Sequence, residues 1–184
     1  ASDRLQVIGG GTVSTNAERD ATLHLTFIES SLDPYLKFVA QELPFSRAVV
    51  SGSVSVKGPL SDMTQLAVAV TVRQAALSLV GYPLTNDEDV RLRFENNRFH
   101  IDQLKLKGED TRLELSGTAD VTTRTADLLA TGEASLAVLQ AFYPLLRAAG
   151  TATLTATLSG PFDALALEGR AEIRDGRLRH QALP

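Results

Sequence analysis

The sequence predicts a mostly β protein: a curled antiparallel meander with two short helices at its apolar face. Three observations predict this fold. Apolar and polar residues alternate with a period of two along most of the chain, turn-forming residues separate these runs, and two short segments have helical spacing instead. Alternation gives each strand one apolar and one polar face, and sequential strands joined by short turns most economically form an antiparallel meander.

The alternating runs continue from the first quarter of the chain to its end. Residues 22–27 alternate Thr or His with Leu or Phe, and residues 50–57 alternate Val or Gly with Ser or Lys. Since successive side chains of a strand point to opposite faces, we expect the apolar members of all the runs to share one face. The residues expected to line this face are Leu23, Leu25, Phe27, Val54, Val56, Val68, Val70, Val72, Leu92, Phe94, Phe99, Ile101, Leu104, Leu106, Leu113, Leu115, Leu154, Leu158, Leu167 and Ile173.

Turn signals fall between the runs. They are Asn96-Asn97, Gly108-Glu109-Asp110, Asp175-Gly176 and the two pairs Gly58-Pro59 and Gly160-Pro161. Each combines residues that favour left-handed or tight-turn backbone conformations. We therefore expect the chain to reverse direction at these places.

One run slips out of phase. Ile101 and Leu104 are separated by Asp102-Gln103, so the two apolar residues share a face only if a bulge lies between them. Bulges bend a sheet, and a bent sheet can curl. We therefore expect a bulge at Asp102-Gln103 and a curled sheet.

Two segments have apolar residues at helical spacing. Residues 31–43 follow a Ser/Asp/Pro start that suits a helix N-terminus. Residues 134–149 show the same spacing, with Pro144 expected to kink the helix and Gly150 to end it. Because the second segment is shorter than a membrane span, we expect it to pack over the apolar face of the sheet.

The chain also repeats itself at a spacing of about a hundred residues. Two segments resemble each other: Gly58-Pro59-Leu60 with the strand after it, and Gly160-Pro161-Phe162 with the strand after it. The similarity extends upstream, where Ser31 aligns with Ser135, so the similar units lie near 31–80 and 135–180. We expect residues 1–184 to be one continuous fragment of a longer repeat solenoid, without a separate linker, because neither end resembles a capping unit. Chance similarity of two strand pairs is the alternative.

Composition excludes several classes of function. With 18 Lys and Arg against 22 Asp and Glu, the net charge is -4, and nucleic acid is not an expected partner because duplex binders carry a basic patch. The absence of cysteine excludes disulfides, thiol nucleophiles and cysteine metal sites. No apolar run has the length of a transmembrane segment, and no secretory signal precedes the first strand.

No group of residues points to catalysis, a metal or a cofactor. His24, His100 and His180 each stand alone, without a second His or a carboxylate at ligand spacing. Asp87-Glu88-Asp89 lacks the alternating ligands of a calcium loop and is expected to be a solvated turn. Gly9-Gly10-Gly11 has no following Lys or helix for a phosphate loop and is expected to mark a bulge or a close backbone approach. We therefore expect a protein that is not an enzyme.

The apolar face is then the candidate functional element. A one-sided sheet covers that face with another sheet, with helices, or by curling around something. Two short helices are little covering for so many strands, so an open apolar groove for acyl chains is one interpretation and a dry, closed core is the other. Burial of each methylene is worth about 0.8 kcal/mol, so an acyl chain gains ample free energy, and a uniform lining lets a lipid slide.

A family resemblance bears on this choice. The order helix, Gly/Ser-rich strand, Gly-Pro turn, alternating strand and then Asp-Gly-Arg-Leu resembles the AsmA-like superfamily, most closely the TamB (DUF490) proteins. Residues 160–178 carry the clearest match, and residues 58–77 carry a weaker one with Gln74-Ala75-Ala76 in place of Asp175-Gly176-Arg177. The similarity of pattern covers nearly the whole chain, through a degenerate motif of common residues.

The resemblance implies a β-taco or groove in a long periplasmic protein, anchored in the inner membrane of a Gram-negative-type bacterium. It implies that the groove conducts phospholipid between the inner and outer membranes and supports outer-membrane biogenesis. It also implies an outer-membrane barrel partner of the TamA or BamA type, contacted through parts outside this fragment, and it brings no catalytic residues. Two other hypotheses stay open: a scaffold or chaperone for assembly or translocation of outer-membrane β-barrel proteins, and a structural spacer with a filled interior.

Overall fold

The structure, a computed structural model, describes residues 6–12, 21–33, 45–59, 62–79, 82–138 and 145–180. The elements in these ranges are strands and two three-residue 3-10 turns, η1 (Met63–Gln65) and η2 (Leu136–Val138). The strands are β1 (Gln6–Thr12), β2 (Ala21–Ser31), β3 (Phe45–Gly58), β4 (Ala67–Leu79), β5 (Tyr82–Asn86), β6 (Val90–Glu95), β7 (Arg98–Gly108), β8 (Thr111–Asp120), β9 (Thr125–Ser135), β10 (Leu146–Pro161) and β11 (Ala166–His180).

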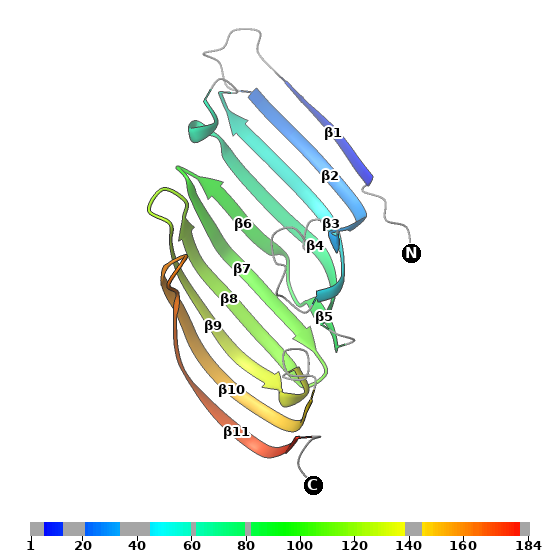
Figure 1. The fold of residues 1–184 in the computed structure, drawn as a ribbon. Helices are drawn as coiled ribbons and strands as arrows, with labels where there is room; N and C mark the ends of the chain where they lie inside the picture. Colours follow the sequence, from blue (N-terminus) through cyan, green and yellow to red (C-terminus); the bar gives the residue numbers. More distant parts are fainter. Residues whose placement is uncertain are drawn as a thin grey trace.

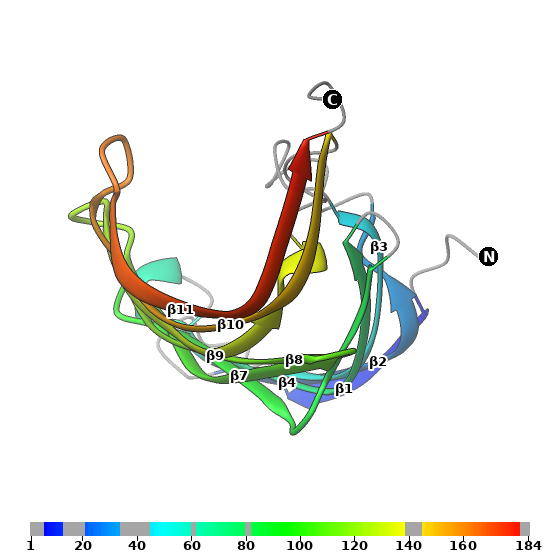
Figure 2. The same ribbon diagram turned by 90° about the horizontal axis from the view of Figure 1, so that it is seen from below.

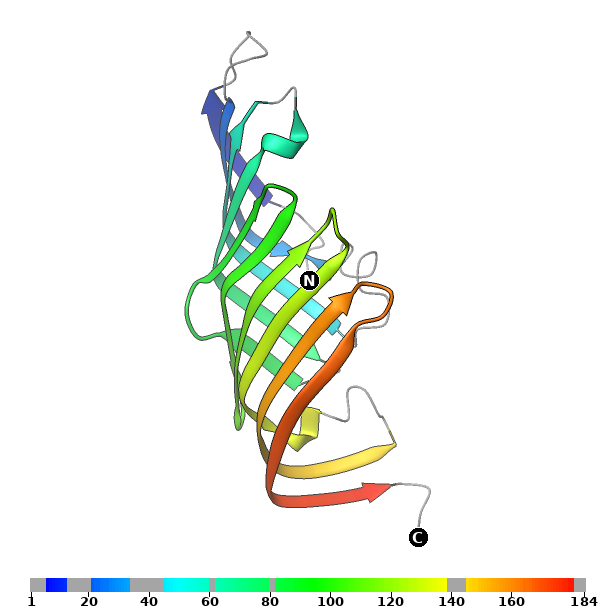
Figure 3. The same ribbon diagram turned by 90° about the vertical axis from the view of Figure 1, so that its left-hand side faces the viewer.

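All the strands in the described ranges belong to one antiparallel sheet (Figure 1). The strand order follows the sequence from β1 at one edge to β11 at the other, except that β5 and β6 do not pair with each other and both lie between β4 and β7. Figure 3 shows these two outermost strands at opposite ends of the stack. The predicted mostly β antiparallel meander is therefore confirmed.

The sheet is curled. Figure 2 shows it bent into a U, with η2 on the inner side of the bend. The position of η2 identifies the side chains that face inward, because Leu136 is buried together with Ala148 and Ala152 of β10. We call the side chains that share a phase with Ala152 across the strand register the inner face, and those of the opposite phase the outer face.

The strands β5 and β6 are two halves of one strand position. Both pair antiparallel with β4 on one side and with β7 on the other. Between them, Asp87, Glu88 and Asp89 leave the sheet as a loop on the outer side, at the bottom of the U in Figure 2. The loop therefore interrupts a strand without changing the strand order.

The side chain of Asn86 holds this interruption in place. Its Oδ1 accepts a hydrogen bond from the backbone N–H of Ala75 at 2.7 Å. Its Nδ2 donates to the carbonyl oxygens of Arg73 at 2.9 Å and Glu88 at 2.8 Å. Since β4 has a register shift at Arg73, one amide satisfies backbone groups at two adjoining irregularities of the sheet.

The bulge predicted in β7 is confirmed. The register with β8 shifts between Ile101 and Leu104, so Asp102 and Gln103 together lie opposite a single residue. Ile101 and Leu104 consequently share the inner face. The extra residues serve the outer face, where Asp102 accepts hydrogen bonds from Arg93.

Two of the predicted turns contain residues with left-handed backbone conformations. Asn96 and Asn97, with φ of 51° and 58°, join β6 to β7, and Asp110, with φ of 49°, lies between β7 and β8. Asn and Asp adopt this conformation more readily than other non-glycine residues. The two Gly-Pro pairs also lie where predicted, because Gly58 ends β3 and Pro161 ends β10.

The turn predicted at Asp175-Gly176 is wrong. Both residues lie inside β11, where the register with β10 shifts opposite Gly150. Asp175 has φ of 53°, so the left-handed signal is real but serves a bulge. The same residue types suit both structures, and only the pairing partner distinguishes them.

The two predicted helices are not supported. In 31–43, Ser31 ends β2, and the prediction otherwise falls mainly on residues 34–43, which lie outside the described residues. In 134–149, the first two residues end β9, η2 is a single 3-10 turn, residues 139–144 lie outside the described part, and 146–149 begin β10. The second helix is therefore wrong at both ends. Pairing along the full length of β11 extends β10 and overrides the local helical spacing.

Ser31 and Ser135, which the repeat aligns, end their strands in the same way. The Oγ of Ser31 accepts a hydrogen bond from the N–H of Asp33, and the Oγ of Ser135 accepts one from the N–H of Ala137, both at 3.3 Å. A hydroxyl that bonds two residues ahead makes a local turn, which competes with continued strand pairing. Both segments thus leave the sheet at a serine whose hydroxyl accepts a hydrogen bond from the backbone two residues ahead.

Replacing Asn86 with Ala is expected to lower the free energy of unfolding by about 1–2 kcal/mol, because backbone groups of three residues lose their partner. Urea unfolding followed by circular dichroism measures this change. Thr85→Ala is the matched control, since Thr85 is the exposed neighbour on the same strand and its loss is expected to cost little. Equal destabilisation by the two substitutions would show that Asn86 does not hold the interruption.

Candidate functional site: the apolar inner face

The register aligns inner-face residues into rows that cross the sheet. One row runs unbroken from β1 to β11, and each member is the Cα partner of the next. Its members are Gly9, Leu25, Val54, Val70, Leu92, Ile101, Gly117, Leu128, Leu158 and Leu167. The row places apolar atoms or bare glycine backbone across the full width of the sheet.

All twenty residues that the sequence assigns to the apolar face lie in this same phase. Parallel to the first row, Leu104 and Leu115 continue into β9 and β10, and so do Leu106 and Leu113, which lead to Leu154. The other members follow from the same pairings: Leu23, Phe27, Val56, Val68, Val72, Phe94, Phe99 and Ile173. The structure therefore brings the whole predicted set onto one surface.

We call a strand position regularly paired when its residue has a direct Cα partner on a neighbouring strand. From Val7 to Leu178, the regularly paired positions of the inner face carry no charged side chain. Four positions carry polar groups, and all four make hydrogen bonds within the protein. They are Ser30, Tyr82, Asn86 and Thr111. Every other regularly paired inner position is Ala, Val, Leu, Ile, Phe or Gly, so the surface offers no free partner to a polar or charged ligand group.

Much of the inner face is open to solvent within the described part of the chain. Fully buried residues gather near strand ends, for example Ala48, Leu84 and Leu136. The central row is half-buried, and at β11 the exposed fraction rises to 73% for Leu167 and 54% for Ile173. A large apolar surface that stays exposed marks an interaction site, because monomeric soluble proteins rarely keep one.

Leu128 belongs to the inner face, although the sequence analysis missed it. It pairs with Gly117 and Leu158, whereas the adjacent Leu129 faces outward and is 42% exposed. Two consecutive leucines fit either phase of an alternating pattern, so periodicity alone does not choose between them. The small partner Gly117 gives no further signal in the sequence.

The glycines of β1 make the close approach that the sequence analysis expected. Gly9 and Gly11 share the inner phase, next to Leu25 and Leu23 of β2. A Cβ at either position would collide with the neighbouring leucine side chain. Glycine therefore lets the two leucines lie over the edge strand.

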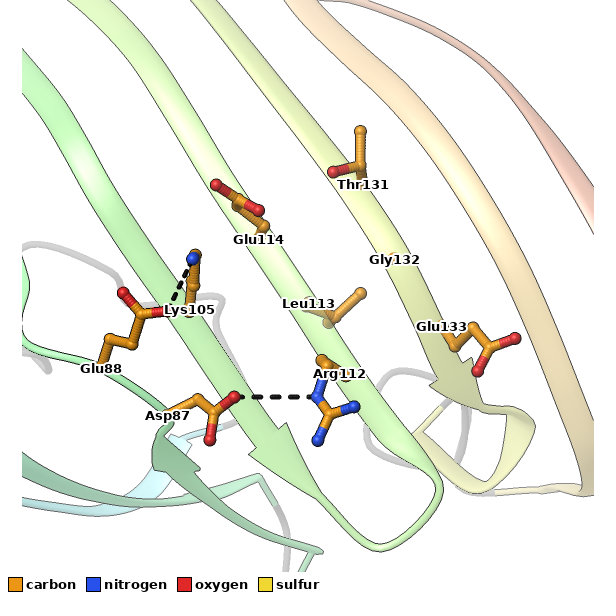
Figure 4. Close-up of a pocket in the computed structure, with 9 residues that line it drawn as sticks. All are labelled: Asp87, Glu88, Lys105, Arg112, Leu113, Glu114, Thr131, Gly132 and Glu133. Atoms are coloured by element: carbon orange, nitrogen blue, oxygen red, sulfur yellow. Dashed lines mark hydrogen bonds and ion pairs between the residues drawn. The ribbon is translucent and has the colours of Figure 1, made fainter.

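The outer face carries the charges that the inner face lacks. The Nζ of Lys107 lies 2.8 Å from a carboxylate oxygen of Asp87. Figure 4 shows two further ion pairs of this loop: the Nζ of Lys105 lies 2.8 Å from Glu88, and the Nε of Arg112 lies 3.7 Å from Asp87. The hydrogen bond from Lys107 lowers the pKa of Asp87, and that from Lys105 lowers the pKa of Glu88. The loop expected to be a simple solvated turn is therefore ion-paired to β7 and β8.

A hollow on the outer face lies beside these ion pairs. The hollow is lined by Asp87 and Glu88 of the loop, Lys105 of β7, Arg112 and Glu114 of β8, and Thr131 and Glu133 of β9 (Figure 4). No group of three or more His, Asp or Glu side chains within the described residues has the geometry of a metal site. Two of the four carboxylates of the lining, Asp87 and Glu88, are engaged by cations.

Two of the three histidines, His24 and His100, lie apart on the outer face. His24 pairs with Gly10 and Ser55, and His100 pairs with Arg93 and Thr118. Neither position brings a second His or a carboxylate ligand set beside the imidazole. The described residues contain no helix with the length and apolarity that crossing a membrane requires.

Asp120 is the carboxylate with the most strongly lowered pKa on the outer face. The backbone N–H groups of Thr123 and Thr122 donate to it at 2.9 Å, and the Nη2 of Arg98 lies 2.9 Å away. The hydrogen bond from Thr123 is the largest cause and that from Arg98 follows, and together they lower the pKa of Asp120 to about 2 from 3.8. The ionised form is therefore favoured in the folded state.

Asp120→Asn is expected to destabilise the protein at neutral pH and to matter less as the pH falls. A lowered folded-state pKa gives stability that is present above the unfolded value near 4 and is lost as the pH falls towards 2. Urea unfolding at pH 7 and at low pH measures the difference between variant and wild type. Asp127→Asn is the control, because Asp127 is an exposed carboxylate on the neighbouring strand β9; an Asp120→Asn deficit that stays constant with pH would contradict the assignment.

Comparison with known proteins finds no relative: no family model, no curated protein and no solved structure matches the chain. The features that bear on function are therefore those of the inner face itself. It is wide, uncharged at its regularly paired positions and half open.

Proposed function

We propose that the protein is a non-enzymatic lipid-binding segment whose inner face holds phospholipid acyl chains and passes them along the sheet. The observation that carries this proposal is the unbroken row from β2 to β11 of apolar residues, one of them the glycine Gly117, with no charge among the regularly paired inner positions. A hydrocarbon chain needs such a surface, and each methylene that leaves water contributes about 0.8 kcal/mol.

The uniformity of the face favours transfer over tight binding at one place. A site that recognises a polar headgroup needs placed donors or charges, and the four polar inner residues already bond within the protein. Neighbouring rows offer similar aliphatic contacts, so a chain shifted along the sheet keeps similar contacts. A ligand that meets nearly equal energies at successive positions moves between them easily.

The cellular setting in this proposal rests on the resemblance to the AsmA-like superfamily and its TamB proteins. In that setting the chain is part of a periplasmic protein anchored in the inner membrane. It conducts phospholipid between the inner and outer membranes and so supports outer-membrane biogenesis. The expected TamA- or BamA-like barrel partner binds through other parts of such a protein.

A second candidate function is a scaffold for outer-membrane β-barrel assembly or translocation. It is favoured by the outer edges of β1 and β11, which pair with no further strand among the described residues, since an open edge can add a strand from an unfolded chain. In this case the ligand is an amphipathic β-peptide held by backbone hydrogen bonds at an edge. The acyl-chain proposal instead places the ligand on the centre of the inner face.

Phospholipid is expected to co-purify with the protein in the absence of detergent and to crosslink to its inner face. A photoreactive amino acid at Phe27, Val70 or Leu115 should capture acyl chains, because these side chains lie in the inner phase. Thr71 and Glu114 are the matched outer-face positions. Mass spectrometry identifies the adducts.

Capture of lipid at inner positions alone would support the acyl-chain proposal. Equal capture on both faces, or a folded protein free of lipid, would contradict it. Capture of added β-peptide at the sheet edges without lipid on the inner face would favour the scaffold.

Val70→Asp is expected to reduce phospholipid transfer between donor and acceptor vesicles at least tenfold, since it sets a charge in the centre of the unbroken row. Val70 is half-buried, so the carboxylate can still reach water in the folded sheet. Thr71→Asp places the same charge on the outer face and should leave transfer unchanged. A folded Val70→Asp protein with undiminished transfer would show that lipid does not cross this face.

A further inference from the structure

Two neighbouring rows of the inner face stay parallel across much of the sheet. One is the row from Gly9 to Leu167 described above, which we call the central row. The second row has members on β2, β3, β4, β6 and β7, each the Cα partner of the next: Leu23, Val56, Val68, Phe94 and Phe99. On each of these strands the two rows are two residues apart, as Leu23 and Leu25 are on β2. No register shift therefore lies between the rows.

The bulges of these strands lie on the other side of the central row. The register shifts after Phe27 on β2, at Arg73 on β4, and at Asp102-Gln103 on β7. Most of the fully buried inner-face residues in the described part of the chain, such as Ala48 and Leu84, lie on that side as well. The members of the central and second rows are half-buried from β2 to β7. The strip between the two rows is thus both regular and open to solvent.

Sheet geometry makes this strip a narrow trough. Within a row, side chains on adjacent strands are about 4.8 Å apart, so Val, Leu, Ile and Phe at these positions form a nearly continuous ridge. Between the rows, positions two residues apart on one strand are separated by about 6.8 Å. The midline of the trough lies about 3.4 Å sideways from each ridge, close to the distance of about 3.5–4.0 Å at which carbon atoms touch.

We propose that this trough takes unbranched acyl chains one at a time, each lying across the strands between the two rows, and that it rejects fused-ring lipids. A single file of methylenes on the midline touches both ridges at once. A fused-ring skeleton is several carbon atoms wide, so it rests on top of the ridges and leaves the trough unfilled. The acyl-chain function proposed above is the basis of this inference, which adds the shape and the orientation of the ligand.

The length of the trough suits one acyl chain. The steps from β2 to β7 through β3, β4 and β6 make it about 19 Å long, at about 4.8 Å per step. The hydrocarbon core of a bilayer is about 30 Å thick, so the acyl chains of one leaflet reach about 15 Å. Because the rows cross the strands, the trough runs along the stack of strands that Figure 2 views end-on.

The trough opens where the second row becomes small. Beyond β7 this row continues as Ala119, Ala126 and Gly160 on β8, β9 and β10. One ridge is therefore low on these strands, and the floor beside the central row is broader. Selection by shape belongs to the stretch from β2 to β7, where both ridges are high.

Competition between ligands of different shape tests the proposal. The unbranched fluorescent fatty acid trans-parinaric acid is expected to bind the full chain and to be displaced by palmitate. Lithocholate carries the same carboxylate on a fused-ring skeleton and should need an about tenfold higher concentration for half displacement, because it does not fit between the ridges. Equal displacement by the two would overturn the inference and leave the acyl-chain function standing. A folded protein that does not bind trans-parinaric acid would contradict both.

Lowering one ridge is expected to remove the selection. Phe94→Ala with Phe99→Ala lowers the second row on two adjacent strands, so lithocholate should then displace the probe at nearly the same concentration as palmitate. Val56→Ala with Val68→Ala lowers the same row on β3 and β4 without touching the aromatic pair, and it should act in the same direction. Circular dichroism checks that each variant keeps its strand content. Unchanged selection in both folded variants would overturn the inference.

Leu104→Ala with Leu115→Ala is the matched control. These two leucines are Cα partners on the inner face, but they lie on the other side of the central row. Their loss should leave the ratio of the two half-displacement concentrations unchanged. A control that shifts this ratio as much as the ridge variants do would show that the trough is not the selecting element.

Photocrosslinking tests the orientation of the chain. A fatty acid with a diazirine at the end of its acyl chain should label the two rows on several strands, from Leu25 of β2 to Ile101 of β7, because the chain lies across the strands. Mass spectrometry of the digested protein maps the adducts. Labelling confined to one strand, such as Val68, Val70 and Val72 of β4, would show that the chain lies along a strand and would overturn the assigned orientation.

Discussion

Cross-strand register is the constraint on which the rest of this structure depends. A shift of one residue in any pairing would turn a strand's leucines and valines to the outer face and bring arginines and carboxylates inside. The bulges at Asp102-Gln103 and near Arg73 each add a residue and so restore the apolar phase within their own strand. The irregularities of the sheet therefore preserve the uniformity of its inner face.

The open inner face also changes what stabilises the protein. Few apolar side chains in the described residues are fully buried, so backbone ladders and cross-strand contacts carry more of the free energy of folding than they do in a two-layer domain. The outer face contributes ion pairs, such as the one between Arg93 and Asp102, that link neighbouring strands. Individually such exposed pairs contribute little, and their value lies in favouring one register over another.

Much of the fold was predictable because alternation is a local signal that survives folding. The meander, the bulge at Asp102-Gln103 and the shared phase of the twenty apolar residues all follow from period-two spacing. Three features depend on pairing partners instead. The left-handed Asp175 forms a bulge and not a turn, Leu128 rather than its neighbour faces inward, and residues 146–149 extend as the start of β10 because they pair with β11. The role of the inner face as a lipid surface stays a prediction.

The unclosed sheet has a mechanical consequence. In a closed barrel, strand number and stagger fix the radius. Here β1 and β11 lie at opposite ends of the strand order and do not pair with each other, so no seam sets the width of the U. Small changes of twist, spread over many strand junctions, can widen or narrow it without breaking a backbone hydrogen bond. The curvature of the sheet can therefore change while the strand pairing stays the same.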